Sequence, residues 1–230
     1  MKKHLKKFIS IINKAYLTLS PVKASFRGSR VYLFKINADK RSHLNLLKSD
    51  FQRSSIQIEG DSNCLDFNES LLVDTSITIS GNHNKIVLAE GVKLRKTTII
   101  IRGNHCTISI GANSSFGEIR MVNVGNNCDI TIGKDCLFAD NIELWASDTH
   151  PIYDNNQQVI NPEESVVIKD NVWVGNHVTI LKGVTIDSGS VVGMGTMVTK
   201  DIPAKVISVG NPNRTIKHDI SWSLNYEGEK

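Results

Sequence analysis

A six-residue period in the last third of the chain restricts its fold more than any other feature. Apolar side chains recur at every sixth position, and small or β-branched side chains follow each of them by four residues. An α-helix repeats every 3.6 residues and a half-buried strand every two, so neither explains the pattern. A three-sided coil with six residues on each side does, because every sixth side chain then points into one narrow core. The first set is Ile168, Val174, Ile180, Ile186, Val192 and Val198, and the second is Val172, Val178, Val184, Ser190, Thr196 and Ile202.

A looser repeat extends this pattern back to about residue 56. Four segments carry a similar turn, mostly Gly-Asn, between short β-branched runs, and their starts are 21, 22 and 23 residues apart. A fixed period of this size is typical of stacked parallel coils. We therefore predict an all-β chain whose residues 56–212 form a parallel β-helix. The segments begin at Ile58, Ile79, Ile101 and Val124.

The two ends of the chain lack the repeat. Residues 1–55 are predicted to be an N-terminal basic helix and cap region, and residues 213–230 a short helical tail. Apolar side chains at helical spacing over residues 4–19 predict an amphipathic helix. This helix either packs on the main domain or lies in the membrane interface with its basic side chains toward lipid headgroups. No segment is long and apolar enough to span a bilayer.

Composition narrows the class of protein. Aromatic residues make up only 6% of the chain, the aliphatic residues are mainly Ile and Val, and the formal net charge is +4. Nine lysines and arginines precede the first acidic residue, Asp39, so the charge of the N-terminus alone would suit anionic lipid, nucleic acid or an acidic glycan. The four cysteines form no C-x-x-C pair or secreted-type framework, so we expect free thiols and a cytoplasmic location.

Four motifs in the last third of the chain carry a family resemblance. Residues 148–151 read Asp-Thr-His-Pro, 172–186 Val-Trp-Val-Gly-Asn-His-Val-Thr-Ile-Leu-Lys-Gly-Val-Thr-Ile, 192–203 Val-Gly-Met-Gly-Thr-Met-Val-Thr-Lys-Asp-Ile-Pro, and 210–214 Gly-Asn-Pro-Asn-Arg. These resemble the hexapeptide-repeat acyltransferases, in the branch of maltose, galactoside and nodulation-factor acetyltransferases. The run 147–154 most resembles enzymes that acetylate capsular and other bacterial surface polysaccharides. The resemblance implies a left-handed coil, a homotrimer with active sites between subunits, and acetyl-CoA as the acetyl donor.

The candidate general base is His150, in an inserted loop over residues 147–165. The six-residue phase is lost after Leu144 and resumes at Ile168, so the loop leaves a rigid coil. An imidazole, with an unperturbed pKa of about 6.5, is largely neutral at cellular pH and can take the proton of an attacking hydroxyl. The alternative is a surface histidine that stabilises the loop before Pro151.

Two further residues are assigned catalytic roles. Asp148 either orients the imidazole, binds the acceptor, or is a solvated loop carboxylate. Trp173 matches a tryptophan that borders the cofactor thiol and the acceptor in the resembling enzymes, and its indole N–H could hydrogen-bond the acceptor or the acetyl oxygen. Alternatively, Trp173 only packs against the loop.

The resemblance also implies a coenzyme A site. Three residues are expected beside the pantetheine arm and three basic residues toward the phosphates, although each basic residue could instead be a solvated charge. The family usually has Ala at the position of Met194, and Ala or Cys at that of Asn213, so this chain departs from its pattern twice. The expected contacts are Asn176, Met194 and Thr199 beside the arm, Lys200, Arg214 and Lys217 toward the nucleotide, and Trp173 at the thiol end.

Histidines at equivalent turns raise the question of a metal. His83 and His105 occupy the same position in successive repeats, but no carboxylate or thiolate accompanies them at ligand spacing. A stacked ladder of turns is the preferred interpretation, and we predict no metal. His177 is expected to be structural.

Together these features predict an acetyl-CoA-dependent O-acetyltransferase with a carbohydrate acceptor, such as a capsular polysaccharide. Two alternatives remain: N-acetylation of an amino sugar or xenobiotic, and a non-catalytic β-helix scaffold. Trp173, Lys200 and Arg214 argue against the scaffold, which needs the six-residue period but no cofactor groove. We expect no nucleic-acid partner.

Overall fold

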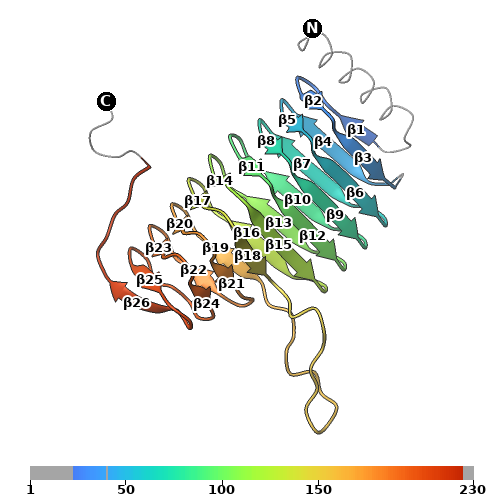
Figure 1. Cartoon of the computed structure of the whole chain (residues 1–230). Helices are drawn as coiled ribbons and strands as arrows, with labels where there is room; N and C mark the ends of the chain where they lie inside the picture. Colours follow the sequence, from blue (N-terminus) through green and yellow to red (C-terminus); the bar gives the residue numbers. More distant parts are fainter. Residues whose placement is uncertain (1–22, 40, 225–230) are drawn as a thin grey trace, which may run out of the picture.

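The described part of the chain is a stack of three-sided coils. The computed structural model describes residues 23–39 and 41–224, and in this part the chain forms strands and turns but no helix. Each coil contributes one strand to each of three sheets, and successive coils pair in parallel along the whole stack (Figure 1). The predicted all-β parallel β-helix is confirmed. No helix of the described residues could cross a membrane.

We name the three sheets A, B and C in the order in which the chain visits them. Among the described residues, sheets A and C each have eight strands and sheet B has ten. Sheet A contains β1 (Lys23–Ser25), β4 (His43–Leu47), β7 (Cys64–Asn68), β10 (Lys85–Leu88), β13 (Thr107–Ile110), β16 (Asp129–Ile132), β19 (Val166–Ile168) and β22 (Thr185–Ile186). Sheet B contains β2 (Arg30–Tyr32), β5 (Asp50–Gln52), β8 (Leu71–Val73), β11 (Lys93–Arg95), β14 (Ser115–Phe116), β17 (Leu137–Phe138), β20 (Trp173–Val174), β23 (Val191–Val192), β25 (Ile207–Val209) and β26 (Arg214–Lys217). Sheet C contains β3 (Lys35–Ala38), β6 (Ser55–Glu59), β9 (Ser76–Ser80), β12 (Thr98–Arg102), β15 (Ile119–Val124), β18 (Ile142–Trp145), β21 (Thr179–Ile180) and β24 (Met197–Val198).

The two periods in the sequence correspond to two sizes of coil. After the loop, Trp173 pairs with Val191 and Thr179 with Met197, a spacing of 18 residues, or three sides of six. Before the loop, Lys85 pairs with Thr107, because longer strands and turns lengthen the coil to 22 residues. All twelve residues of the two six-residue sets are buried, so the periodicity identified the core of this region correctly.

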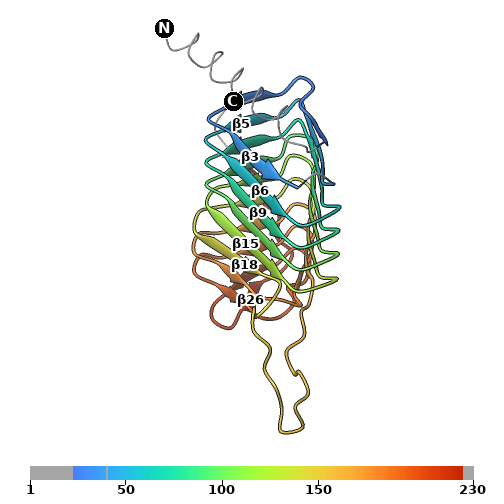
Figure 2. The same cartoon turned by 90° about the vertical axis from the view of Figure 1, so that its right-hand side faces the viewer.

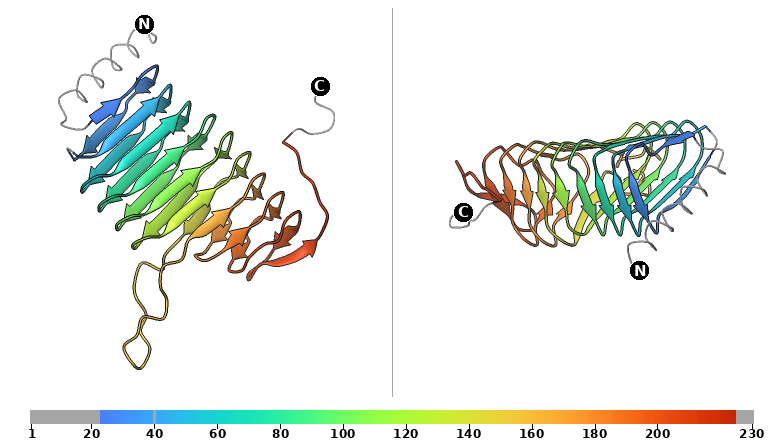
Figure 3. Two further views of the ribbon diagram at one scale, coloured as in Figure 1. Left: turned by 180° about the vertical axis from the view of Figure 1, so that it is seen from behind. Right: turned by 90° about the horizontal axis from the view of Figure 1, so that it is seen from above.

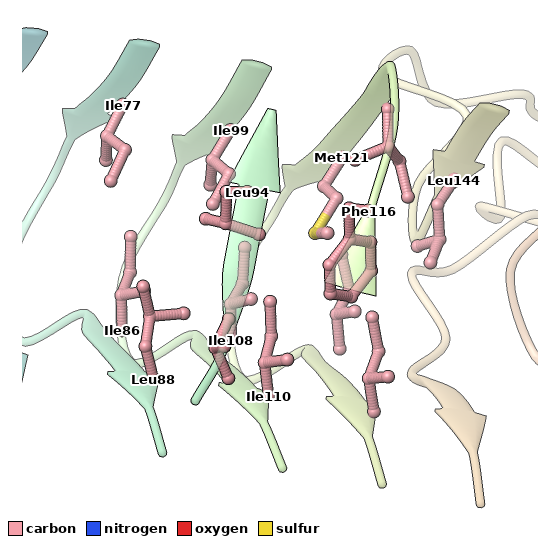
Figure 4. Packing of buried hydrophobic residues seen from close by; sticks show 14 of the residues in the cluster. Ile77, Ile86, Leu88, Leu94, Ile99, Ile108, Ile110, Phe116, Met121 and Leu144 are labelled. Atoms are coloured by element: carbon pink, nitrogen blue, oxygen red, sulfur yellow. The ribbon is translucent and has the colours of Figure 1, made fainter. Parts of the chain in front are cut away.

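Apolar side chains from successive coils stack on one another along the core. On sheet C, Ile77, Ile99, Met121 and Leu144 lie in register in successive coils, and all are at most 1% exposed (Figure 4). Apolar atoms that stack at the spacing of β-strands leave little void, which favours one register over its alternatives.

The turns between sheet C and the next strand of sheet A form a second ladder, which we call the C-to-A edge. The amide of Asn82 donates to Asn104 and that of Asn104 to Asn126, each at 3.0 Å. The imidazoles of His83 and His105 stack with centroids 4.8 Å apart and planes 8° from parallel. The predicted ladder of turns is therefore confirmed at these two histidines.

The ends of the chain differ from the sequence prediction. Residues 23–55 were expected to be a cap region, but they already form coils from β1 onward. Ion pairs one coil apart join these coils: Lys48–Glu69 at 2.6 Å and Arg53–Asp74 at 2.6 Å at the other two edges, and Arg41–Asp61 at 2.7 Å at the C-to-A edge. The helix predicted over residues 4–19 lies outside the described residues.

The predicted helical tail is wrong for residues 213–224. The strand β26 instead pairs antiparallel with β25, because a terminal strand leaves unpaired backbone groups that another strand can satisfy. The chain then runs back along the side of the stack (Figure 3), where the N–H of Ile220 donates to the carbonyl of Lys205.

Candidate active site

The loop that carries His150 projects from the stack (Figure 2). The chain leaves sheet C after Trp145 and enters sheet A at Val166, at the C-to-A edge. A bridge between Tyr153 and Val159 closes the outer part of the loop into a narrow hairpin. Four apolar residues of this hairpin are 50% or more exposed, an unusual density for a surface loop and typical of a surface that contacts another chain. They are Ile152, Tyr153, Val159 and Ile160.

His150 sits at the base of this loop, directly after a tight turn. Its backbone N–H donates to the carbonyl of Asp148 at 2.8 Å, and Thr149 between them has a φ of +65°. The His150 side chain is exposed, so its imidazole is accessible to a substrate. The residue proposed as the base is thus held by backbone geometry and open to solvent.

The Asp148 carboxylate is engaged by two other residues. Its Oδ2 accepts hydrogen bonds from Lys182 Nζ at 2.6 Å and Asn161 Nδ2 at 2.9 Å. These bonds hold the pKa of Asp148 below its usual range, because both stabilise the ionised form. The Lys182 bond ties the loop to the coil, whereas the Asn161 bond joins the two sides of the loop. The orientation of the imidazole by Asp148 stays a prediction.

Trp173 lies on the outer face of sheet B, with its side chain 40% exposed. Its ring is 5.9 Å, centroid to centroid, from Trp222 in the C-terminal segment, with 44° between the planes. The indole N–H of Trp222 donates to the carbonyl of Asn171 at 2.9 Å, which fixes that ring beside Trp173. The sequence prediction missed Trp222, because the tail that carries it has no repeat to reveal its position.

Asn176 and Met194 lie in consecutive coils at the turns between sheets B and C, which we call the B-to-C edge. The N–H of Gly195 donates to the carbonyl of Asn176 at 2.9 Å, so the two turns are stacked. The Asn176 side-chain oxygen accepts from the N–H of Asp140, which gives Asn176 a structural role as well. Met194 is 70% exposed, and its side chain points away from the core.

The last four predicted cofactor residues lie at the C-terminal end of the stack. Thr199 and Lys200 follow β24, while Arg214 and Lys217 begin and end β26. Asn213 joins these segments, because its Oδ1 accepts from the N–H of Thr199 at 2.9 Å and its Nδ2 donates to the carbonyl of Lys200 at 3.1 Å. Asn213, where the resembling family has Ala or Cys, therefore joins two parts of the predicted site by hydrogen bonds.

The predicted residues do not converge in one chain. The loop of His150 leaves at the C-to-A edge, Trp173 lies on sheet B, and Met194 lies at the B-to-C edge. The outer face of sheet C also carries a hollow of about 420 Å³, lined in part by Arg120, Glu143 and His177, which contains none of the predicted site residues. Within one chain the predicted residues therefore do not form one continuous site.

Comparison with known proteins identifies the repeat. Residues 165–200 match the bacterial transferase hexapeptide family (six repeats). In this region the chain is similar to the hexapeptide-repeat family. The matched region covers the coils from β19 to β24, where the 18-residue period is strict.

Two solved structures resemble this hexapeptide-repeat chain over most of its length. The polySia-specific acetyltransferase NeuO is 29% identical with a TM-score of 0.73, and the match covers 90% of each chain. The polysialic acid O-acetyltransferase OatWY is 27% identical with a TM-score of 0.70, covering 90% of this chain and 94% of OatWY. A polysialic acid O-acetyltransferase of Escherichia coli O1:K1 / APEC is 36% identical over 96 residues, which are 41% of this chain and 31% of that protein. The chain spans about a third of the length of the curated relatives it matches.

Proposed function

We propose that this hexapeptide-repeat protein is an acetyl-CoA-dependent O-acetyltransferase that modifies a hydroxyl of a bacterial capsular or other surface polysaccharide. The observation that carries the proposal is the similarity over 90% of the chain to two acetyltransferases of polysialic acid. The exposed imidazole of His150 on the projecting loop supports it, because acetyl transfer to an alcohol needs a base.

In the proposed mechanism His150 carries the proton. Acetyl-CoA supplies an acetyl group that is already activated as a thioester. His150 accepts the proton of the acceptor hydroxyl while the hydroxyl oxygen bonds to the acetyl carbon, and the carbon–sulfur bond breaks. The imidazolium then returns the proton to the departing thiolate. A positioned base of this kind contributes roughly 10²–10⁴-fold to the rate.

The donor is proposed to lie along the B-to-C edge and the end of the stack. Two glycines flank the exposed Met194 there, and the space beside Gly195 is open, since a Cβ at Gly195 would meet nothing within 4 Å. Lys200, Arg214 and Lys217 are exposed and form no salt bridge with any described residue, so they are available for phosphates. Both features fit an extended amide-rich arm that ends in an anionic nucleotide.

We further propose a homotrimer of left-handed coils. The His150 loop and Trp173 lie on different sides of one chain, and the exposed apolar hairpin needs a surface to cover it. In the proposed trimer, sheet B of a neighbouring copy faces the loop. That copy covers the apolar hairpin and brings its own Trp173 beside His150. The reaction is assigned to the cytoplasm, where the four unpaired cysteines stay reduced.

The test is acetyl transfer with a matched inactive variant. The protein is incubated with acetyl-CoA and a panel of acidic and neutral capsular polysaccharides, and free thiol release is followed. His150→Ala should lower kcat at least about 10²-fold while thermal stability and coenzyme A binding stay near the parent values. A variant that keeps full turnover would rule out His150 as the base.

The bond formed in the product separates the alternatives. Acetyl groups that mild alkali removes are esters, as an O-acetyltransferase requires, whereas alkali-stable acetyl groups would indicate N-acetylation. Coenzyme A binding with no acetyl transfer to any acceptor of the panel would leave the β-helix as a binding scaffold.

A further inference from the structure

Lys182 makes three hydrogen bonds to the base of the loop. It lies at the C-to-A edge one coil beyond the loop, and its side chain is only 15% exposed. Its ammonium donates to Asp148 Oδ2 at 2.6 Å, to the carbonyl of Asn161 at 3.0 Å and to that of Pro162 at 2.8 Å. All three ammonium protons are therefore used, and they bind both the outgoing and the returning strand of the loop.

Asn161 completes the connection on the loop side. Its Nδ2 donates to Asp148 Oδ2 at 2.9 Å and to the carbonyl of His150 at 3.0 Å, and its Oδ1 accepts from the N–H of Ile152 at 2.6 Å. Lys182 and Asn161 thus fix the backbone on both sides of the imidazole. We call Asp148, Asn161 and Lys182 the loop latch.

The latch holds a strained turn. Among the described residues, Thr149 is the only β-branched residue with a positive φ, and β-branched side chains rarely adopt this conformation. The N–H of His150 closes a three-residue turn around Thr149, and the N–H of Thr149 itself donates to Ser147 Oγ at 2.9 Å. Such a backbone persists only where its surroundings over-determine it, and it is often found at functional sites.

We propose that Lys182 is a positioning residue for His150, which fixes the catalytic imidazole through the loop latch rather than by contact with a substrate. The catalytic part of this inference rests on the proposed function. Without the ammonium, the Asp148 carboxylate loses its charged partner and both returning carbonyls lose their donor. The turn at Thr149 then relaxes, and the imidazole samples orientations in which it cannot reach the acceptor hydroxyl.

The test compares Lys182→Met, which keeps length without a donor, with Lys182→Arg, which keeps donors and charge. We expect Lys182→Met to lower kcat about 10- to 100-fold, because a displacement of about 1 Å in a catalytic group can cost 10²-fold. The KM for acetyl-CoA should change less than about threefold, since the latch lies away from the proposed donor groove. Lys182→Arg should recover most of the loss, and Lys169→Met, which removes an exposed ion pair with Asp187, should match the parent.

Amide hydrogen exchange measures how firmly the loop latch holds the backbone, and it needs no substrate. In Lys182→Met the amides of Thr149, His150 and Ile152 should exchange at least about tenfold faster, while those of the coils stay protected. Asn161→Ala, a change confined to the loop, should produce the same pattern even if Lys182→Met fails to fold. Unchanged exchange at these amides together with parental kcat would overturn the proposal. If the parent itself transfers no acetyl group, the proposed function fails, whereas exchange still decides whether Lys182 fixes the loop.

Discussion

The glycines of the C-to-A edge allow a sharp test of how the coils stack. Gly103 lies between Gly81 and Gly125 in this ladder and has a φ of +149°. A Cβ added at Gly103 would come within 1.6 Å of the carbonyl oxygen of Gly125, which is backbone of the next coil and cannot rotate away. Gly103→Ala must therefore push two coils apart at the same edge from which the His150 loop later leaves the stack.

Gly195 provides a matched control for this substitution. It also has a positive φ, +72°, but a Cβ there would meet nothing within 4 Å. Gly195→Ala should cost only the conformational penalty, about 1–2 kcal/mol of unfolding free energy. Gly103→Ala adds displacement of packed backbone, for which overpacked cores lose roughly 1–3 kcal/mol more.

The assay is thermal unfolding followed by circular dichroism, with all three proteins at one concentration. An additional loss of about 2 kcal/mol should place the melting temperature of Gly103→Ala roughly 4–8 °C below that of Gly195→Ala. Equal melting temperatures for the two variants would show that the coils can separate at no cost, and would refute the idea that close backbone contact between glycines sets the stacking at this edge.

Two further substitutions and one thiol reagent probe the core and the tail. Phe138→Ala should lower the unfolding free energy by about 3–5 kcal/mol in urea denaturation, because Phe138 is buried and its ring stacks on Phe116 at 4.5 Å; a loss below about 1 kcal/mol would contradict this. The Cys136 thiol, whose pKa burial raises to about 11, should resist a disulfide reagent at pH 8 in the native protein and react once the chain is unfolded in denaturant; rapid native reaction would show that the core is open. Trp222→Ala should speed hydrogen exchange in the segment 218–224 without lowering the melting temperature by more than about 4 °C, because its bond to Asn171 joins only the tail to the coil; unchanged exchange would mean that other contacts hold the tail.

The sequence predicted the core well where one physical rule determined it. Residues at every sixth position must fill the same narrow interior, so burial of Ile180 or Val192 follows from the period alone. The N-terminal coils were not predicted, because their turn at Asp39, on the C-to-A edge, does not have the Gly-Asn sequence that marks the later turns. A different signal was present there: Arg30 pairs with Asp50 and Lys48 with Glu69, opposite charges repeated about one coil apart.

The site was less predictable because its residues lie where the period stops. A motif places His150 and Asp148 in the loop, but nothing in the sequence pairs Asp148 with Lys182, 34 residues later. That contact depends on where the returning strand re-enters the stack. The same holds for Trp222, whose place beside Trp173 follows from the reversal of the chain at β26.

The coil and the loop are held by different kinds of contact, which explains how the chain can combine a rigid stack with a strained turn beside His150. Apolar side chains hold the coils in one register, so the position of Lys182 is set by a core that tolerates little displacement. The loop has no such core, and polar contacts to Lys182 and Asn161 hold its base instead. The strain at Thr149 is therefore opposed by a few hydrogen bonds anchored on a stiff support. Substitutions in the loop latch should consequently change the geometry of His150 more than they change the stability of the coils. A site carried by a loop on a repeat scaffold requires this difference.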